Sequence, residues 1–158
     1  MLDPETHTLS KHFTHLVGRE VKFTKATLAP ERAGRWVFAS YQVVAPEDPT
    51  TTKSLVVKAE LDLLGSLAGC LVGLPSYEVL SRLRSQTLDE LMRDAIYEIL
   101  NVASGAIAYN CRTSLVEMAM AAVDVKGDAA KVLATPSRKS TFDVVVQGYN
   151  GGRFVVLA

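Results

Sequence analysis

Residues 87–109 have the sequence TLDELMRDAIYEILNVASGAIAY, which is the strongest helix signal in the chain. Its apolar residues recur at the spacing of an α-helix, in which successive side chains lie about 100° apart. Thr87 and Glu90 match a capping box, in which the threonine hydroxyl accepts a hydrogen bond from the Glu90 amide and the glutamate reaches back. We therefore expect one helix over residues 87–109 that begins at this cap.

One side of this helix is polar. Asp94, Glu98, Asn101 and Gly105 are spaced i, i+4, i+7 and i+11, so they fall on one line along the helix axis. The opposite side is broad and apolar, with Ala95, Ile96, Ile99, Val102, Ala103, Ala106 and Ile107. The apolar side is expected to face a sheet, and the polar stripe is then presented to solvent or to a partner.

Two features of the stripe are unusual for a plain solvated surface. Asp94 and Glu98 are like charges at i, i+4, which costs a few tenths of a kcal/mol. Gly105 is expected inside the helix, at a cost of roughly 1 kcal/mol relative to alanine, which a closely approaching partner backbone would explain. The spacing alone is also typical of a solvated helix face with a chance asparagine.

The remaining pattern predicts an α+β fold, a mostly antiparallel sheet covered by two or three helices. Further helices are expected at residues 4–18 and 76–83. Strands are expected at residues 20–27, 35–44, 53–63, 66–74, 114–125, 141–147 and 153–157. Asn150-Gly151 is expected to supply the positive φ angles of a hairpin, and residues 126–128 a turn. The length of 158 residues fits one domain, residues 1–158.

Composition narrows the class of partner. Seventeen basic residues balance seventeen acidic ones, so we expect neither nucleic acid nor a membrane surface as partner. The start of the chain lacks the pattern of a signal peptide and no stretch has the length of a membrane span, which favours a cytoplasmic protein. His7, His12 and His15 lie close in sequence, but no nearby Cys, Asp or Glu completes a set of ligands, so no metal site is expected.

The polar stripe resembles a known signature. Asp94-Ala-Ile-Tyr-Glu98-Ile-Leu-Asn101 is similar to the D/S-x3-E-x2-N motif of the CheC/CheX/FliY phosphatase family. The resemblance covers residues 65–108, including the segment Gly65-Ser66-Leu67, taken as a strand, and the helix at residues 76–83. The chain length and the single copy of the motif resemble CheX rather than the two-motif CheC. The family pattern continues to a later proline, whereas this chain has none between Asn101 and Pro136.

The resemblance implies a CheX-like phosphatase that removes the aspartyl phosphate of a CheY-like response regulator in chemotaxis or two-component signalling. Asn101 would orient the attacking water, and Glu98 would pair with the active-site lysine of the receiver domain. Asp94 and Gly105 would be partner contacts. The chain would bind no cofactor of its own, because the Mg²⁺ ion belongs to the receiver. The resemblance also implies a homodimer, and the apolar last strand, expected at a sheet edge, favours pairing.

Two other functions fit the same sequence. A CheX-like module without catalysis would dock receiver domains or flagellar partners as a scaffold, which the missing proline and the unmatched N-terminal third favour. A purely structural dimerisation domain would not bind a receiver at all. Glu98 and Asn101 occurring together favour the enzyme.

Overall fold

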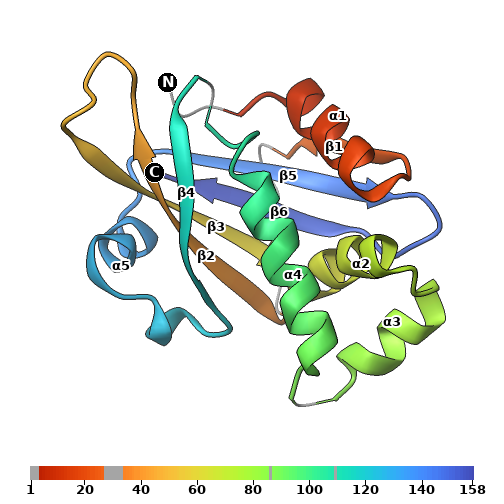
Figure 1. Ribbon diagram of the computed structural model, residues 1–158. Coiled ribbons are helices and arrows are strands. Elements are labelled where there is room, and N and C mark those ends of the chain that lie inside the picture. Colours follow the sequence, from red (N-terminus) through yellow and green to blue (C-terminus); the bar gives the residue numbers. More distant parts are fainter. Residues whose placement is uncertain (1–3, 27–33, 86, 109) are drawn as a thin grey trace.

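The computed structural model describes residues 4–26, 34–85, 87–108 and 110–158. A six-stranded sheet in the order β1-β5-β6-β3-β2-β4 runs through its centre, and all neighbouring strands are antiparallel (Figure 1). The strands are β1 Val21–Lys25, β2 Trp36–Val44, β3 Thr52–Glu60, β4 Arg112–Ala119, β5 Lys139–Val146 and β6 Gly152–Leu157. The predicted α+β fold with an antiparallel sheet is confirmed.

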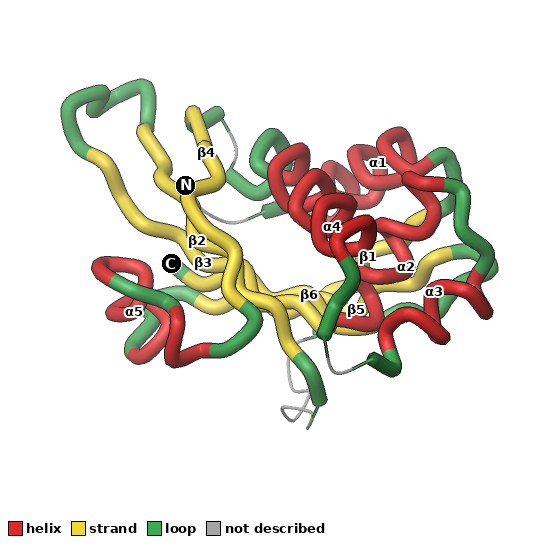
Figure 2. Tube along the Cα trace, turned by 60° about the horizontal axis from the view of Figure 1, so that its bottom comes forward, coloured by secondary structure: helices red, strands yellow, loops and turns green. Residues whose placement is uncertain are grey.

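Helices lie on both sides of the sheet. They are α1 Thr6–Val17, α2 Leu61–Val72, α3 Ser76–Leu83, α4 Glu90–Ala103 and α5 Gly127–Ala134, with a 3₁₀ turn at Ala122–Asp124. Helices α1, α2 and α4 gather on one side, whereas α5 lies apart from them (Figure 2). The helices predicted at the N-terminus and at residues 76–83 are confirmed. None of the helices in the described part of the chain has the length and apolar composition of a membrane-spanning segment.

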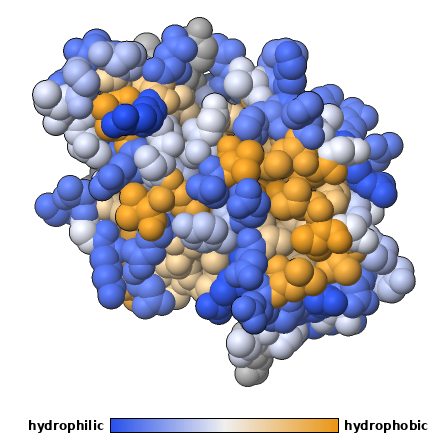
Figure 3. All heavy atoms as spheres, in the orientation of Figure 1, coloured by the Kyte–Doolittle hydropathy of each residue, from blue (hydrophilic) through white to orange (hydrophobic). Residues whose placement is uncertain are grey.

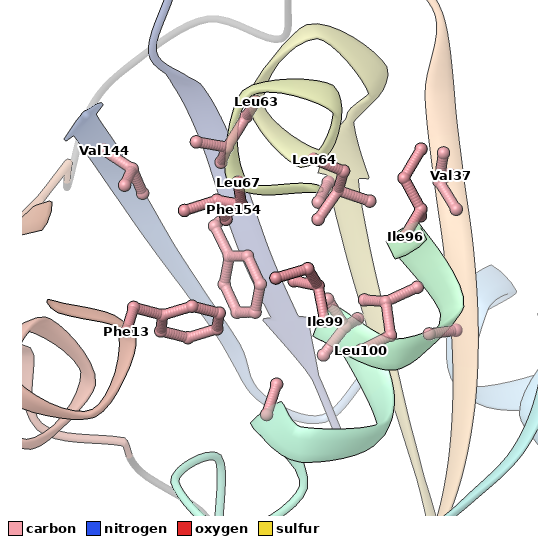
Figure 4. Close-up of a cluster of buried hydrophobic side chains, with 14 of the residues drawn as sticks. Phe13, Val37, Leu63, Leu64, Leu67, Ile96, Ile99, Leu100, Val144 and Phe154 are labelled. Atoms are coloured by element: carbon pink, nitrogen blue, oxygen red, sulfur yellow. The ribbon is translucent and has the colours of Figure 1, made fainter. Parts of the chain in front are cut away.

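The main core lies between the sheet and helices α1, α2 and α4. Phe13 of α1, Leu67 of α2, Ile99 of α4 and Phe154 of β6 are fully buried there and converge in Figure 4. Alternate residues of the strands point to the other face, where a smaller cluster packs under α5. Its buried members are Phe38, Val56, Ala119, Val125, Ala129, Val155 and Leu157. Each face of the sheet therefore has its own apolar layer.

Helix α2 corrects the expected strand at residues 66–74 and the strand assignment of Gly65-Ser66-Leu67. Residues 63–69 are all buried, and Ser66 is the one polar residue among them, so no exposed polar face marks a helical period. A short, mostly apolar run of this kind is indistinguishable from a buried strand. A Cβ atom at Gly65 or Gly69 would collide with Leu83 or Val79 of α3. The glycine spacing therefore allows close packing of two helices, not of a sheet.

The region after β4 also differs from expectation. The strand expected over residues 114–125 ends at Ala119, and the expected turn at residues 126–128 is the start of α5. Helix α5 has only eight residues, too few for a clear apolar period. Its buried residue Ala129 packs against the sheet, and that tertiary contact, rather than local sequence, accounts for the helix.

The last strand is not an edge. β6 pairs with β5 on one side and β3 on the other, so its apolar residues reflect burial on both faces. The edges of the sheet are β1 and β4. In the hairpin between β5 and β6, the positive φ belongs to Gly148, at 79°, and not to Asn150-Gly151 as expected. Gly151 instead lies where a Cβ atom would collide with the Val144 carbonyl.

Candidate functional site

Helix α4 is shorter than expected. It begins after Asp89, whose carboxylate accepts a hydrogen bond from the Met92 amide at 2.9 Å, so Asp89 and not Thr87 is the N-cap. Arg82 of α3 also lies 3.5 Å from the Asp89 carboxylate. The helix ends at Ala103, and residue 109, the last of the expected helix, lies outside the described residues. Asp89 therefore fixes where the helix starts.

The two sides of α4 are arranged as predicted. Its buried residues are Met92, Ala95, Ile96, Ile99, Leu100 and Ala103. Asp94, Glu98 and Asn101 are exposed on the opposite side. Within the described residues, the side chains of these three make no hydrogen bond and no ion pair. Two carboxylates and a carboxamide are therefore in line and available to a partner.

Gly105 lies beyond the helix, in the turn that follows it. A Cβ atom there would meet His12 Cε1 and the Val102 carbonyl oxygen at 3.7 Å, which is ordinary van der Waals contact. The expected cost of a glycine inside the helix does not apply, and that prediction is wrong. The expected role of Gly105 as a partner contact stays a prediction, without the argument from helix geometry.

Two apolar side chains border the polar stripe and were not singled out from the sequence. Leu91 is 46% exposed and Tyr97 is 43% exposed. On a helical wheel they lie about 60° to either side of Asp94. Figure 3 shows hydrophilic side chains along α4 beside an apolar area over α2. The exposed surface of α4 thus combines a charged centre with apolar borders, and it offers both charged and apolar contacts to a partner.

The C-terminal end of α4, which carries Asn101, is held by two other elements. The Tyr41 hydroxyl of β2 donates to the Leu100 carbonyl at 2.6 Å. His12 Nε2 of α1 lies 3.0 Å from the Val102 carbonyl, and because a carbonyl only accepts, this nitrogen donates. These carbonyls belong to the last turn, where intrahelical donors run out. The residues on both sides of Asn101 are therefore tied to the body of the protein.

The end of the helix is tightened in the same place. Backbone amides of Ser104, Gly105 and Ala106 donate to carbonyls three residues earlier, at 2.9–3.2 Å. Such i→i+3 bonds are the 3₁₀ geometry common at helix ends. Burial raises the pKa of the Tyr41 phenol far above its usual value, and Tyr97 adds to the shift. Tyr41 therefore stays protonated and keeps its donor through the neutral range.

The exposed surface of α4 is acidic. Glu90, Asp94 and Glu98 are exposed on α4, with Arg93 as the exposed cation of the helix. In the described part of the chain, no group of three or more His, Cys, Asp or Glu side chains is placed to hold a metal ion. His12, one of the three histidines close in sequence, instead supports α4. Such a surface is complementary to a basic group on a partner.

Comparisons with known proteins bear on the fold. No protein-family model and no curated protein matches the chain. Among solved structures, FliY from Thermotoga maritima matches with a TM-score of 0.63 at 12% identity, covering 98% of this chain and 84% of that one. A chain of the FliG-FliM complex from H. pylori matches with a TM-score of 0.62 at 10% identity, covering 98% of this chain and 86% of that one.

CheX from Vibrio vulnificus matches with a TM-score of 0.55 at 14% identity, covering 96% of this chain and 93% of that chain. Each of these matches spans nearly the whole chain, including the N-terminal third for which the sequence showed no resemblance. Identities this low show a shared fold and do not show a shared activity. The chain has the CheC/CheX/FliY-like fold, common to chemotaxis protein CheX, FliY and the middle domain of FliM.

Proposed function

We propose that this protein is a phosphatase that hydrolyses the aspartyl phosphate of a CheY-like receiver domain. The observation that supports this most is the line formed by Asp94, Glu98 and Asn101 on the exposed side of α4. Their side chains are not used by the fold, and the end of α4 that carries Asn101 is tied down by Tyr41 and His12. The CheX-like fold and the matching signature make a receiver domain the partner of choice.

Asn101 is suited to position water. Its carboxamide offers one acceptor and two donors on a short side chain, so it can hold a water molecule in line with the phosphorus atom. Water then attacks phosphorus, the bond from phosphorus to the receiver's carboxylate oxygen breaks, and inorganic phosphate leaves. A carboxamide is not a base, so its contribution is orientation, as in other phosphoryl transfers. The Mg²⁺ ion that neutralises the phosphoryl charge belongs to the receiver.

Glu98 is one helical turn before Asn101 and is suited to docking. A carboxylate paired with the receiver's active-site lysine forms a charge-assisted hydrogen bond that fixes the register of the helix. Asp94 extends the negative charge by another turn and favours approach of a basic surface. Leu91 and Tyr97 supply apolar contact on both sides of this pair. A cytoplasmic location is part of this proposal, because the proposed receiver partner is a cytoplasmic domain.

A homodimer is a further proposal that comes from the resemblance. β6 is a central strand, so the edges at which a second copy could extend the sheet are β1 and β4. β4 contains a register shift opposite Ser40 and Tyr41, which leaves Val116 as the extra residue of a bulge. A bulge on an edge strand opposes regular strand pairing, so a dimer that extends the sheet is expected through β1 rather than β4.

A non-catalytic scaffold is the second candidate. It is favoured by the match to FliM, which one solved structure shows in complex with FliG, and by the missing proline after the helix. The same exposed surface of α4 would then bind a receiver or a flagellar protein without accelerating hydrolysis. Asn101 separates the two candidates, because a docking surface does not need a side chain that positions water.

The test uses a CheY-like receiver phosphorylated by a small-molecule phosphodonor in the presence of Mg²⁺. Phosphate release is followed with and without the protein, and receiver binding is measured in parallel. If the protein is a phosphatase, phosphate release is faster in its presence, and the Glu98→Ala, Asn101→Ala double variant loses this acceleration. Binding with no acceleration would support the scaffold, and neither binding nor acceleration would contradict both. Lys126→Ala, an exposed change far from α4 in sequence, serves as the matched control.

A further inference from the structure

A pocket of about 550 Å³ lies between the start of β2 and the start of α4, which are found at the same end of the molecule (Figure 1). The edge strand β4 ends at Ala119, opposite Phe38, whereas β2 already begins at Trp36. The hollow therefore lies beside the first residues of β2, beyond their pairing with β4. The polar stripe on α4 contributes no residue to it.

The buried part of the pocket lining is apolar. Phe38 of β2 is 7% exposed, and Leu88, just before α4, is 6% exposed. Trp36 and Met120 also line the pocket and are half-buried. These four side chains come from three separate parts of the chain and pack against the two apolar clusters of the protein. The apolar lining is therefore held in place by tertiary packing.

The exposed part of the lining is cationic. Arg35 and Arg93 are both exposed, and no described residue that lines the pocket is acidic. The Arg35 guanidinium donates from Nη1 to the Leu83 carbonyl of α3, which holds the side chain in place. A guanidinium has five N–H donors, so one such bond leaves the others for a ligand.

Arg93 is not used by the packing of α4. Its side chain makes no hydrogen bond or ion pair with any residue that the structure describes. Asp89, one turn earlier, lies 3.5 Å from Arg82 instead. Glu90, three residues before Arg93, is exposed and does not line the pocket. The Arg93 guanidinium is therefore available to an anion in the pocket.

We propose that this pocket binds a small amphipathic carboxylate, an organic acid with an apolar body about the size of a phenyl ring. The apolar body packs on Phe38 and Leu88, and the carboxylate faces the two guanidinium groups, which suit bidentate pairing with carboxylates. The Thr87 hydroxyl, also in the lining, adds a neutral donor. The volume lies within the ~300–1,000 Å³ typical of small-molecule sites.

Both parts of the ligand are needed. Ion pairs at exposed positions contribute little by themselves, so a small anion without an apolar body binds weakly. A neutral apolar molecule fills the buried part of the pocket but does not pair with the guanidinium groups. Because the pocket shares no residue with the polar stripe, its occupancy is independent of the proposed phosphatase reaction.

The chain contains a single tryptophan, Trp36, which lines the pocket and reports on its occupancy. The experiment titrates the full chain with 3-phenylpropionate at constant ionic strength. Binding is followed by tryptophan fluorescence and, independently, by saturation transfer from the protein to the ligand protons in NMR. Parallel titrations use 3-phenylpropanol, which has the apolar body without the charge, and acetate, which has the charge without the body.

Saturable binding of 3-phenylpropionate that is tighter than binding of either control compound supports the site. Arg93→Gln should weaken this binding about fivefold. Arg112→Gln, at an exposed position of β4 that does not line the pocket, should bind as the wild type does. Circular dichroism confirms that each variant is folded.

Three results would overturn the proposal. The first is a titration with 3-phenylpropionate that shows no saturation by about 20 mM, a concentration at which a ligand of this size should be bound. The second is equal binding of 3-phenylpropanol or acetate. The third is an Arg93→Gln variant that titrates like the wild type, or like Arg112→Gln.

Discussion

Helices α2 and α4 pack against each other in the same core, yet they are built on different principles. Helix α2 is buried over residues 63–69, and its glycines admit α3. Helix α4 buries only one side, and its other side carries Asp94, Glu98 and Asn101 with no role in packing. The fold therefore accounts for the residues of α2. It does not account for the exposed line on α4, because these side chains have no role in packing.

The largest effect is expected where α2 is most crowded. Gly69→Leu places a side chain against Val79, which is buried and stiff, so overpacking should lower the free energy of unfolding by about 3 kcal/mol. The matched control is Gly105→Ala after α4, which meets only ordinary contacts and should change stability by less than about 0.5 kcal/mol. Urea denaturation measures both. Equal changes in the free energy of unfolding at Gly69 and Gly105 would contradict the difference in packing between α2 and α4.

The next effect concerns the link between α4 and the sheet. Tyr41→Phe removes the hydroxyl that donates to the buried Leu100 carbonyl, which should lower the free energy of unfolding by about 1–2 kcal/mol. The same variant should slow receiver dephosphorylation several-fold, because the backbone beside Asn101 is less fixed. A variant that is less stable but fully active when folded would show that Tyr41 does not position Asn101.

Tyr41 also predicts a pH dependence. Its pKa in the folded protein is raised by burial above the value of about 10 that it has when unfolded. The protonated phenol is then favoured by folding, so its contribution is complete below pH ~10 and is lost as the pH rises toward the folded pKa. Wild-type stability should fall above pH ~10, and Tyr41→Phe should fall less steeply in urea titrations at pH 9–11. Identical slopes would contradict this assignment.

A smaller effect is expected at the apolar border of the stripe. Leu91→Ala removes exposed apolar contact with a partner, so KM for the phosphorylated receiver should rise about fivefold, close to 1 kcal/mol, with kcat unchanged. Val145→Ala on β5 removes an exposed side chain on a different part of the surface and is the matched control. Steady-state dephosphorylation kinetics distinguish them. A fall in kcat with an unchanged KM would place Leu91 in another role.

The smallest effect is the repulsion within the stripe. Asp94→Ala removes one of two like charges at i, i+4 and should raise the free energy of unfolding by a few tenths of a kcal/mol, in part because alanine also favours the helix. The same change should weaken receiver binding slightly, since Asp94 supports docking. Stability gained together with binding lost is the signature of a functional charge. Binding that is unaffected would leave Asp94 as an ordinary surface residue.

The sequence predicted α4 well because its two sides differ in polarity. The orientation of Asp94, Glu98 and Asn101 followed from their spacing alone. Helix α2 could not be predicted in the same way, since burial on all sides removes the period that distinguishes a helix from a strand. Helix α5 was missed because a short helix depends on tertiary contact. The place of β6 in the sheet is set by strand order, on which local composition gives no information.

The site was predictable only in part for a related reason. Residues that point outward on α4 can be read from periodicity, but Tyr41 and His12 come from strand β2 and helix α1, far away in the chain. No local pattern indicates that these side chains meet the carbonyls beside Asn101.

The claim that the exposed line on α4 serves catalysis is tested most directly by Asn101→Ala in a single-turnover dephosphorylation assay with saturating protein. We expect the rate to fall about 100-fold, which corresponds to a barrier about 2.7 kcal/mol higher, with receiver binding and the free energy of unfolding essentially unchanged. A variant that dephosphorylates the receiver as fast as the wild type would contradict it.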